Sequence, residues 1–421
     1  MINTKDYLLC INVEDTPYML WQLELFIWST VKNQYKDYKV EPQNILAVFT
    51  LNNPGTGNLT ELSTYAKSII EYYDIKYVID NENYGHNAGI PRCREEKFGK
   101  ATLHKVGYLP INKPCSLIPI FNSDYCKDYK FIVLLEADLF AYGGINFDKF
   151  PTDKTSIAQH WVMDQWAKGG DANKPGEAFD QSDIATLSDG RIIDDGERKR
   201  RARENDFQQG IGLKDWLETV GGDSEKLVPG SCMIWFKKED LTIELIDNMI
   251  LWTNFIATAS TLSTGKQLWT SELPCYSLAL AKCNVDVEKI ECMEFDPGNM
   301  SSQVHNDPIP IGSLIHYTYS EIWPLNGSCS SDILQSGDDY TGNYSGHEAA
   351  DGYFNKRCYG SYDGGSNNIF YYIDDLKSGL ELAVSDHSRA FFQSCLNIAR
   401  TVNINRNHPL CNNTPSGTCE R

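Results

Sequence analysis

The order of apolar and polar positions predicts alternating strands and helices over the first 80 residues. Continuous apolar runs at 7–13, 44–50 and 76–80 are typical of buried strands. Apolar residues with helical spacing at 19–34 and 59–73 predict an amphipathic helix after each of the first two strands. This alternation predicts the α/β class, with a mainly parallel central sheet flanked by helices and ligands at the carboxyl ends of the strands.

The same patterns continue downstream. The strongest strand signal is the apolar run 129–135, which ends in Glu136-Ala137-Asp138. The remaining segments predict strands at 155–166, 227–236 and 311–319 and helices at 241–259, 270–283 and 374–398. We expect residues 1–325 to form one domain, with a polar inserted loop at about 167–226, and residues 326–421 to form an irregular C-terminal extension that packs on it.

Composition narrows the class of protein. Hydrophobic residues make up 41% of the chain and aromatic residues 12%, which is typical of a folded globular protein. The net charge of −19 disfavours nucleic acid and anionic membrane as partners. A basic run at 198–203 is flanked by acidic residues within 194–206, which favours a self-compensated surface loop. The 13 cysteines include no C-x-x-C pair and therefore no zinc signature.

No targeting segment is visible in the sequence. No stretch of 18 apolar residues occurs, and the polar start is followed by only a short apolar run. We therefore expect a cytoplasmic protein with no membrane segment.

Three places along the chain contain residues that could bind a metal ion or take part in catalysis. Glu136 and Asp138 follow the strongest strand, and their hard oxygen ligands suit Mg²⁺ or Mn²⁺. His316, within Ile315-His316-Tyr317, is a candidate second ligand because neutral imidazole also binds Mn²⁺. Glu272 starts a predicted helix and could line an acceptor site as a base. Each has a plainer alternative: strand-end carboxylates, a buried hydrogen-bonded histidine, and a helix-capping charge.

Two weaker candidates would bind a nucleotide. Lys113, in Asn112-Lys113-Pro114, could contact a diphosphate, and Tyr18 could stack on a base. A surface lysine and a core tyrosine explain these residues equally well. No G-x-G-x-x-G or Walker pattern is present, so a dinucleotide or P-loop site has little support.

Seven short motifs in order resemble the plant-type peptidyl hydroxyproline O-arabinosyltransferases and the related peptidyl serine galactosyltransferases. The matches in this sequence are Pro17-Tyr18-Met19-Leu20-Trp21-Gln22, Tyr108 to Pro114, Leu135 to Asp138, Pro229-Gly230-Ser231, Trp269 to Glu272, Ile315 to Tyr319, and Asn355 to Tyr359. They cover about half of the chain. The sequence departs from the family at Leu139 and at Ser320 to Trp323, so the resemblance bears on the donor more than on the acceptor.

The resemblance implies a GT-A-like nucleotide-sugar-binding fold, a UDP-sugar donor, Mn²⁺ (or Mg²⁺), and retention of configuration when a sugar is transferred to a hydroxyl. It implies that Asp138 and His316 hold the metal and that Glu136 orients the donor or a metal-bound water. The other implied roles are Glu272 at the anomeric carbon, Tyr18 and Gln22 at the nucleoside, and Asn112, Lys113, Lys356 and Arg357 at the donor.

Several functions stay open at this point. The first is transfer of L-arabinofuranose to a hydroxyl of a peptide or another macromolecule, and galactosyl transfer to serine is its nearest alternative. A phage-type transferase acting on hydroxymethylated bases in DNA would use the basic run at 198–203. A non-catalytic glycan-binding module is the alternative outside enzymes.

Overall fold

The computed structural model describes part of the chain, namely residues 4–32, 35, 38–51, 61–80, 111–158, 217, 221–228, 230, 233–264, 272–290, 294–295, 309–316, 323–324, 353–354, 368–371, 373–383 and 386–405. The charged loop at 194–206, most of the expected inserted loop at 167–226, and both Lys356 and Arg357 lie outside these residues. Within them, no helix has the length and apolar composition needed to cross a bilayer.

The central element is a seven-stranded sheet with the order β3-β2-β1-β4-β7-β6-β8. Its strands are β1 (Tyr7–Glu14), β2 (Ile45–Thr50), β3 (Lys76–Asp80), β4 (Phe131–Glu136), β6 (Thr155–Ala158), β7 (Ile234–Lys237) and β8 (Val287–Ile290). All neighbouring pairs are parallel except those of β7, which is antiparallel to both β4 and β6. The predicted α/β class with a mainly parallel central sheet is therefore confirmed.

Two smaller sheets accompany the central one. β5 (Leu139–Tyr142) pairs antiparallel with β10 (Ser313–His316), which also pairs parallel with β9 (Glu294–Phe295). β11 (Trp323–Pro324) pairs with β12 (Tyr353–Phe354). Short 3-10 turns lie at Thr4–Asp6, Pro42–Asn44, Asp124–Asp128, Phe147–Lys149, Ser224–Lys226 and Ile369–Tyr371.

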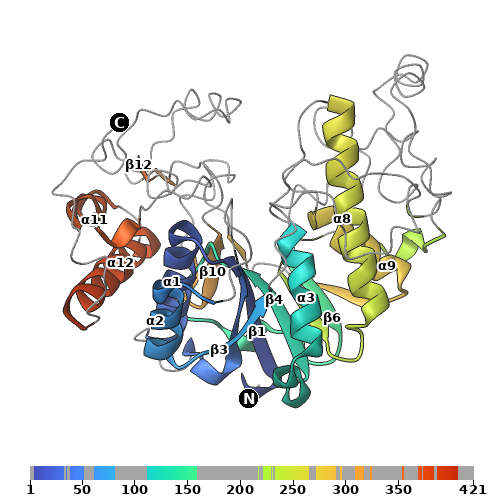
Figure 1. Ribbon diagram of the computed structural model, residues 1–421, viewed down its shortest axis with the longest axis horizontal. Coiled ribbons are helices and arrows are strands. Elements are labelled where there is room, and N and C mark those ends of the chain that lie inside the picture. The colour runs from blue at the N-terminus through green and yellow to red at the C-terminus, as the bar shows by residue number, and fades with distance from the viewer. Residues whose placement is uncertain are drawn as a thin grey trace.

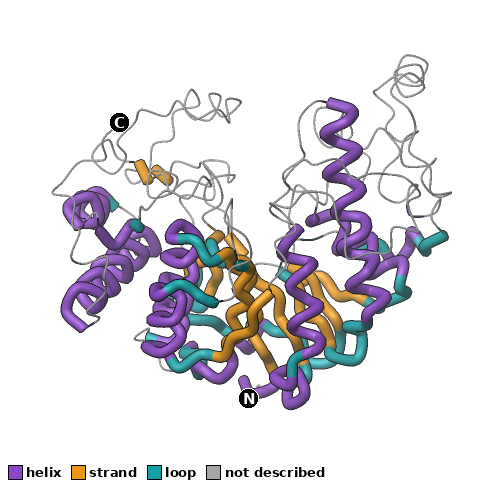
Figure 2. The backbone as a smooth tube through the Cα atoms, viewed as in Figure 1, coloured by secondary structure: helices purple, strands orange, loops and turns teal. Residues whose placement is uncertain are grey.

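Helices cover both faces of the central sheet (Figures 1 and 2). α1 (Pro17–Val31) and α2 (Thr64–Tyr73) lie on one face, and α3 (Asn112–Asn122), α8 (Ile243–Thr264) and α9 (Glu272–Lys282) lie on the other. Successive side chains of a strand point to opposite faces, so each strand contributes to two cores. Leu8 and Cys10 belong to the core beneath α3, α8 and α9, whereas Leu9 and Ile11 belong to the core beneath α1 and α2.

α1 is buried on two sides, which the sequence pattern did not predict. We expected an amphipathic helix over 19–34, but the helix runs from Pro17 to Val31 and its buried residues are Tyr18, Leu20 to Ile27, and Ser29 to Val31. α11 (Ile373–Leu382) and α12 (Asp386–Asn405) explain the difference, because they pack against the side of α1 that faces away from the central sheet. A helix that is apolar nearly all round needs such a second covering layer.

The connection between β6 and β7 starts and ends at the same edge of the sheet. β7 runs opposite to β6, so Ala158 at the end of β6 lies beside Met233 just before β7, and the Ala158 N–H donates to the Met233 carbonyl oxygen at 3.0 Å. Gly230 packs closely against this join, since a Cβ there would lie 2.4 Å from Ile157 Cγ1. The chain between these points is thus inserted at the edge where the parallel strands end.

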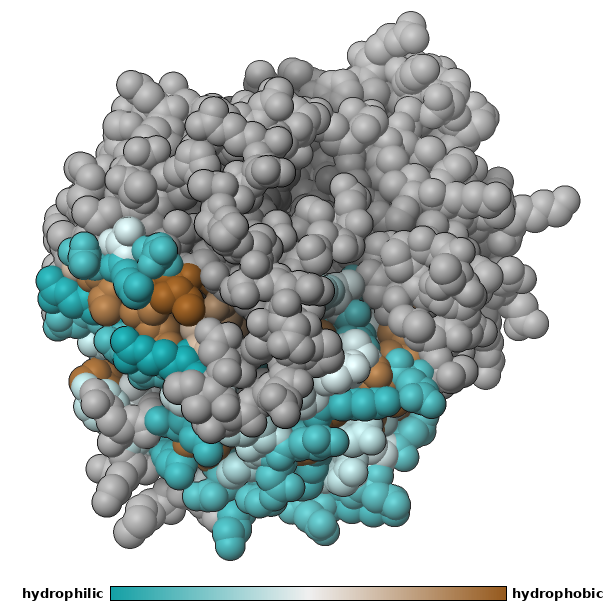
Figure 3. Space-filling model, turned by 60° about the vertical axis from the view of Figure 1, so that its left-hand side comes forward, coloured by the Kyte–Doolittle hydropathy of each residue, from teal (hydrophilic) through white to brown (hydrophobic). Residues whose placement is uncertain are grey.

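The outer surface is mainly hydrophilic, as expected of a chain with a net charge of −19. On the face shown in Figure 3 most of the described surface is hydrophilic, with apolar side chains showing over a limited area. The large apolar side chains are instead gathered in three buried clusters, two against the central sheet and a third between α1, the β5–β10 pair and the C-terminal helices.

Candidate active site

The candidate site lies where the order of the parallel strands reverses. From β1 the chain passes through α1 to β2 and then outward to β3, whereas β4 pairs with the other side of β1. Asn12 of β1 lies opposite Glu136 at the end of β4. In open α/β sheets, ligands bind in the crevice outside the carboxyl ends of the strands at such a reversal.

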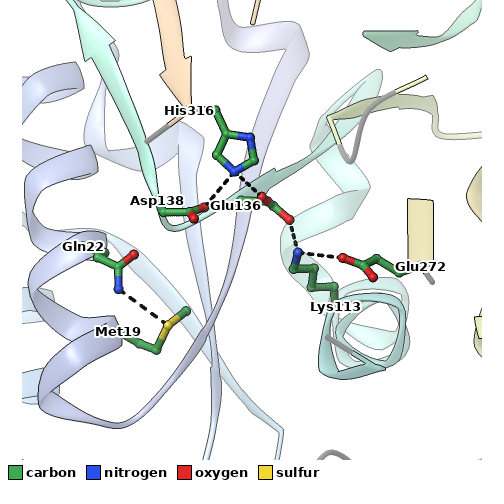
Figure 4. A network of polar contacts seen from close by, with 7 residues as sticks. All are labelled: Met19, Gln22, Lys113, Glu136, Asp138, Glu272 and His316. Atoms are coloured by element: carbon green, nitrogen blue, oxygen red, sulfur yellow. Dashed lines mark hydrogen bonds and ion pairs between the residues drawn. The ribbon is translucent and has the colours of Figure 1, made fainter. Parts of the chain in front are cut away.

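Glu136, Asp138 and His316 meet at this point through strand pairing. β4 ends at Glu136, a turn at Ala137-Asp138 follows, and β5 begins at Leu139, which lies opposite His316 in the β5–β10 pair. His316 Nε2 lies 2.6 Å from Glu136 Oε2 and 3.2 Å from Asp138 Oδ1. Glu136 and His316 are 8% and 7% exposed. Residues far apart in the chain thus form one group, in which Asp138 is partly exposed (Figure 4).

This group fits a metal ion. Each of the three residues offers one ligand atom, and these atoms all lie within 4.8 Å of one another. Two ligands on opposite sides of an octahedral ion with bonds of about 2.1 Å would lie roughly 4.2 Å apart, so small side-chain shifts would bring all three to one ion. Two carboxylates and one imidazole suit Mn²⁺ or Mg²⁺ better than a thiolate-preferring metal.

Lys113 and Glu272 approach the same group from two helices. Lys113 is near the start of α3 and donates to both Glu136 Oε1 and Glu272 Oε1, the latter at 3.0 Å. Glu272 is the first residue of α9 and is 2% exposed. The N-terminus of a helix favours a carboxylate and disfavours a cation, so α9 stabilises Glu272, while Lys113 at α3 depends on its two carboxylate partners.

The five side chains carry an excess of negative charge. Three carboxylates and one lysine give −3 + 1 = −2 when His316 is neutral. Burying unbalanced charge is unfavourable, so a divalent cation between Glu136, Asp138 and His316 would neutralise the group. The charge balance and the ligand geometry therefore favour the same kind of occupant.

Of the other predicted residues, Asn112 adjoins Lys113, whereas Tyr18 and Gln22 make contacts within α1. Asn112 starts α3 and donates from Nδ2 to Glu14 Oε1 at 3.1 Å, at the end of β1. Tyr18 is buried with its ring edge-on to Trp21. Gln22 donates to the Tyr18 carbonyl oxygen at 2.9 Å, a contact within α1. Their roles at a nucleoside stay predictions, as do those of Lys356 and Arg357.

Sequence reasoning missed Glu14 and its neighbour Asp15. Glu14 is 8% exposed and is the last residue of β1, directly at the strand reversal. Asp15 accepts from the Ser63 N–H and hydroxyl, both at 2.6 Å, and so joins the end of β1 to the start of α2. Burial raises the pKa of the Asp15 carboxyl, against the opposing effect of these hydrogen bonds. The signal was present, because both acids directly follow an apolar strand.

Comparison with known proteins gives distant likenesses. No family model matches the sequence, and no curated protein matches it. Among solved structures, the bifunctional glycosyltransferase WbbM in its apo form is 10% identical, with a TM-score of 0.36 over 94% of this chain and 52% of that one. Apo mouse xyloside xylosyltransferase 1 is also 10% identical, with a TM-score of 0.33 over 74% of this chain and 97% of that one. This chain therefore spans about half the length of WbbM.

Proposed function

We propose that this protein is a metal-dependent glycosyltransferase that uses a nucleotide-sugar donor. One observation carries the proposal: a group with a formal net charge of −2, in which Glu136, His316 and Glu272 are buried and three residues offer metal-type ligands, lies at the carboxyl ends of β1 and β4. A divalent cation there would neutralise the residues and would also bind the diphosphate of a donor placed in the same crevice. The ordered sequence motifs around Trp21, Lys113, Glu272 and His316 support the same reading.

Each residue has a role in this proposal. Asp138 and His316 hold the cation, with Glu136 completing the ligands or orienting a bound water. The cation, when bound, neutralises the charge that develops on the leaving diphosphate. Lys113 exchanges a carboxylate partner for a phosphate oxygen, and Lys356 and Arg357 close over the diphosphate. Asn112, Tyr18 and Gln22 bind the nucleoside part of the donor.

The chemical step is a substitution at the anomeric carbon. The bond from that carbon to the diphosphate oxygen breaks, a bond to the acceptor oxygen forms, and the hydroxyl proton is released with the nucleoside diphosphate. Glu272 faces the reacting carbon, where its negative charge stabilises the positive charge that develops on the sugar. Its position at the start of α9, held by Lys113 at 3.0 Å, fits this role.

The finer proposal concerns the sugar and the acceptor. We propose that UDP-L-arabinofuranose is the donor, that the acceptor is a hydroxyl of a peptide or another macromolecule, and that the configuration is retained. This part depends on the resemblance of the seven motifs, with galactosyl transfer to serine as the alternative. A few hydrogen bonds in the sugar pocket decide between pentose and hexose, so the donor has to be identified by experiment.

A donor panel tests the proposal directly. Thermal unfolding would be followed with UDP-sugars, each with and without Mn²⁺, and a true donor at a hundredfold excess over its dissociation constant should stabilise the fold by about 2.7 kcal/mol. Release of UDP would then be measured for the wild type, Asp138→Ala, and Asp148→Ala as the control. Asp148 is an exposed acid outside the site.

The outcomes separate the alternatives. We expect UDP release that depends on Mn²⁺, is lost in Asp138→Ala and is unchanged in Asp148→Ala. Full activity of Asp138→Ala would show that the metal assignment is wrong. Binding of a glycan without any UDP-sugar turnover, by hydrolysis or transfer, would instead support the non-catalytic module.

A further inference from the structure

The C-terminal helices pack against the strands that carry two of the proposed metal ligands. Phe391 of α12 is fully buried, and its ring meets Phe140 of β5 edge-on at a centroid distance of 5.5 Å. Phe140 lies opposite Ile315 in the β5–β10 pair, and both belong to the third buried cluster with Phe391. α12 thus contacts the strand pair next to the site.

The ligands sit at the ends of this same strand pair. Asp138 immediately precedes β5, and His316 is the last residue of β10. On one side the pair is covered by the second buried cluster, which contains Leu139 and Leu314, and on the other by the third, which contains Phe140 and Ile315. Two layers of packing therefore border the strand pair that carries Asp138 and His316, and the outer one is formed by α12 together with Trp21 and Leu25 of α1.

We propose that α12 is a positioning element for the metal site. Through Phe140, Phe391 holds β5 and β10 so that Asp138 and His316 stay at a distance that one cation can bridge. The inference depends on the proposed function, because it requires that the site binds a divalent cation. It gives α12, which belongs to the expected extension at 326–421, a role in positioning the ligands in addition to covering apolar surface.

The energetic basis is coupling between packing and ligand geometry. Partners that orient metal ligands from outside typically change metal affinity by about 10- to 100-fold when they are removed. Coupling of this kind is reciprocal, so a cation that favours the docked arrangement of α12 must also stabilise α12 against opening. The two directions can be measured independently.

The neighbouring residue Phe392 offers a matched control. It is 1% exposed, belongs to the same cluster and meets the Phe391 ring edge-on at a centroid distance of 5.4 Å, but it also packs toward α11, where a Cβ at Gly379 would lie 2.4 Å from Phe392 Cε1. A change of Phe to Ala at either position removes the same atoms and should cost about 3–5 kcal/mol of stability. A difference between the two variants in metal affinity therefore reports contact with β5 and not general loosening.

The experiment measures binding of Mn²⁺ alone to the full chain by calorimetry, without donor or acceptor. We expect Phe391→Ala to weaken the affinity about tenfold or more, and Phe392→Ala to leave it nearly unchanged. Phe391→Leu, which keeps most of the side-chain volume, should recover most of the affinity. If the alanine variants do not fold, the comparison is made between Phe391→Leu and Phe392→Leu, and the smaller loss that remains with leucine should be confined to position 391.

Hydrogen exchange supplies the reciprocal measurement. Mn²⁺ should slow exchange of the backbone amides of α12 in the wild type and should have no such effect in His316→Ala. Equal losses of Mn²⁺ affinity at positions 391 and 392 would overturn the inference. Hydrogen exchange in α12 that does not change when Mn²⁺ is added would also overturn it. Neither result would contradict the metal site itself. Absence of Mn²⁺ binding by the wild type would overturn both the inference and the metal-dependent part of the proposed function.

Discussion

The two sides of the candidate site are built differently. On one side, Asp138 and His316 come from strands, β5 and β10, that the C-terminal helices cover. On the other, Lys113 and Glu272 come from the first turns of α3 and α9, which pack on the central sheet with α8. Glu136 touches both sides, since one of its oxygens lies near His316 and the other accepts from Lys113.

The two sides of the site also differ in how the charges of their side chains are balanced. The strand side brings together two carboxylates and an imidazole that could hold a cation. The helix side already contains a cation of its own in Lys113. Removal of a ligand on the strand side should therefore weaken metal binding, whereas removal of Lys113 on the helix side should strengthen it.

The largest effect is expected on the strand side. His316→Ala removes one of three ligand atoms and should weaken Mn²⁺ binding by on the order of 100-fold or more, a larger loss than that for a partner outside the ligands. Calorimetric titration with Mn²⁺ checks this result. Asp148→Ala is the control, since Asp148 is exposed and is not one of the ligand group. Wild-type affinity in His316→Ala would remove His316 from the site.

A second prediction separates chemistry from metal binding on the helix side. Glu272→Gln keeps the shape of the side chain but removes the charge that faces the reacting carbon. We expect turnover to fall by about 100-fold, the range found when one electrostatic contact in an active site is lost. Mn²⁺ affinity should fall much less than turnover, because Glu272 is not among the three ligands and only the net charge of the group changes, from −2 to −1. A parallel loss of turnover and Mn²⁺ affinity would place Glu272 among the ligands instead.

Lys113→Met tests whether a change on the helix side strengthens Mn²⁺ binding. Without the lysine, Glu136 and Glu272 lose their shared partner, and the metal-free protein should lose about 1–3 kcal/mol, less than for a fully buried pair because Lys113 is 27% exposed. Mn²⁺ should bind more tightly, since the group then carries a charge of −3. Thermal unfolding in EDTA and in Mn²⁺ measures both effects. Lys113→Arg keeps the charge and should behave like the wild type in both conditions.

The smallest effect is expected for the reactivity of two buried thiols, one on a helix of each side. Burial raises the pKa of Cys395 on α12 and of Cys275 on α9 well above the ordinary value for a thiol. Only the thiolate reacts, so at pH 8 neither residue should be alkylated by iodoacetamide in the native protein, as mass spectrometry would show. In mild urea Cys395 should react first, because α12 belongs to the outer layer. Earlier labelling of Cys275 would show that α9 opens before α12.

Much of the central sheet could be predicted from the sequence because its strands carry a strong local signal. β1, β2 and β4 are buried on both faces, so each appears as a continuous apolar run. α1 was harder, since its burial depends on α12, which lies far away along the chain. α3 was not predicted at all, because Pro114 and Pro119 interrupt the pattern expected of a helix.

The sequence named candidates for the site but not their contacts. Glu136 and Asp138 stand at the end of the strongest strand, which made them candidate metal ligands beside the plainer alternative of strand-end carboxylates, and the resemblance of the motifs added the others. The pairing of Leu139 with His316 and the hydrogen bond from Asn112 to Glu14 join residues far apart in sequence. No local pattern reports such pairings, so the position of Lys113 between two carboxylates became visible only in the structure.

The join between β6 and β7 has a consequence for how the length of the segment between these strands can change in evolution. The ends of the intervening segment are fixed beside each other at Ala158 and Met233, next to the edge that carries the site. Closing a loop becomes only about 0.6 kcal/mol less favourable each time its length doubles, so the sheet tolerates segments of very different size here. Segments of different length can therefore be inserted between Ala158 and Met233 while the pairing of β6 with β7 stays the same.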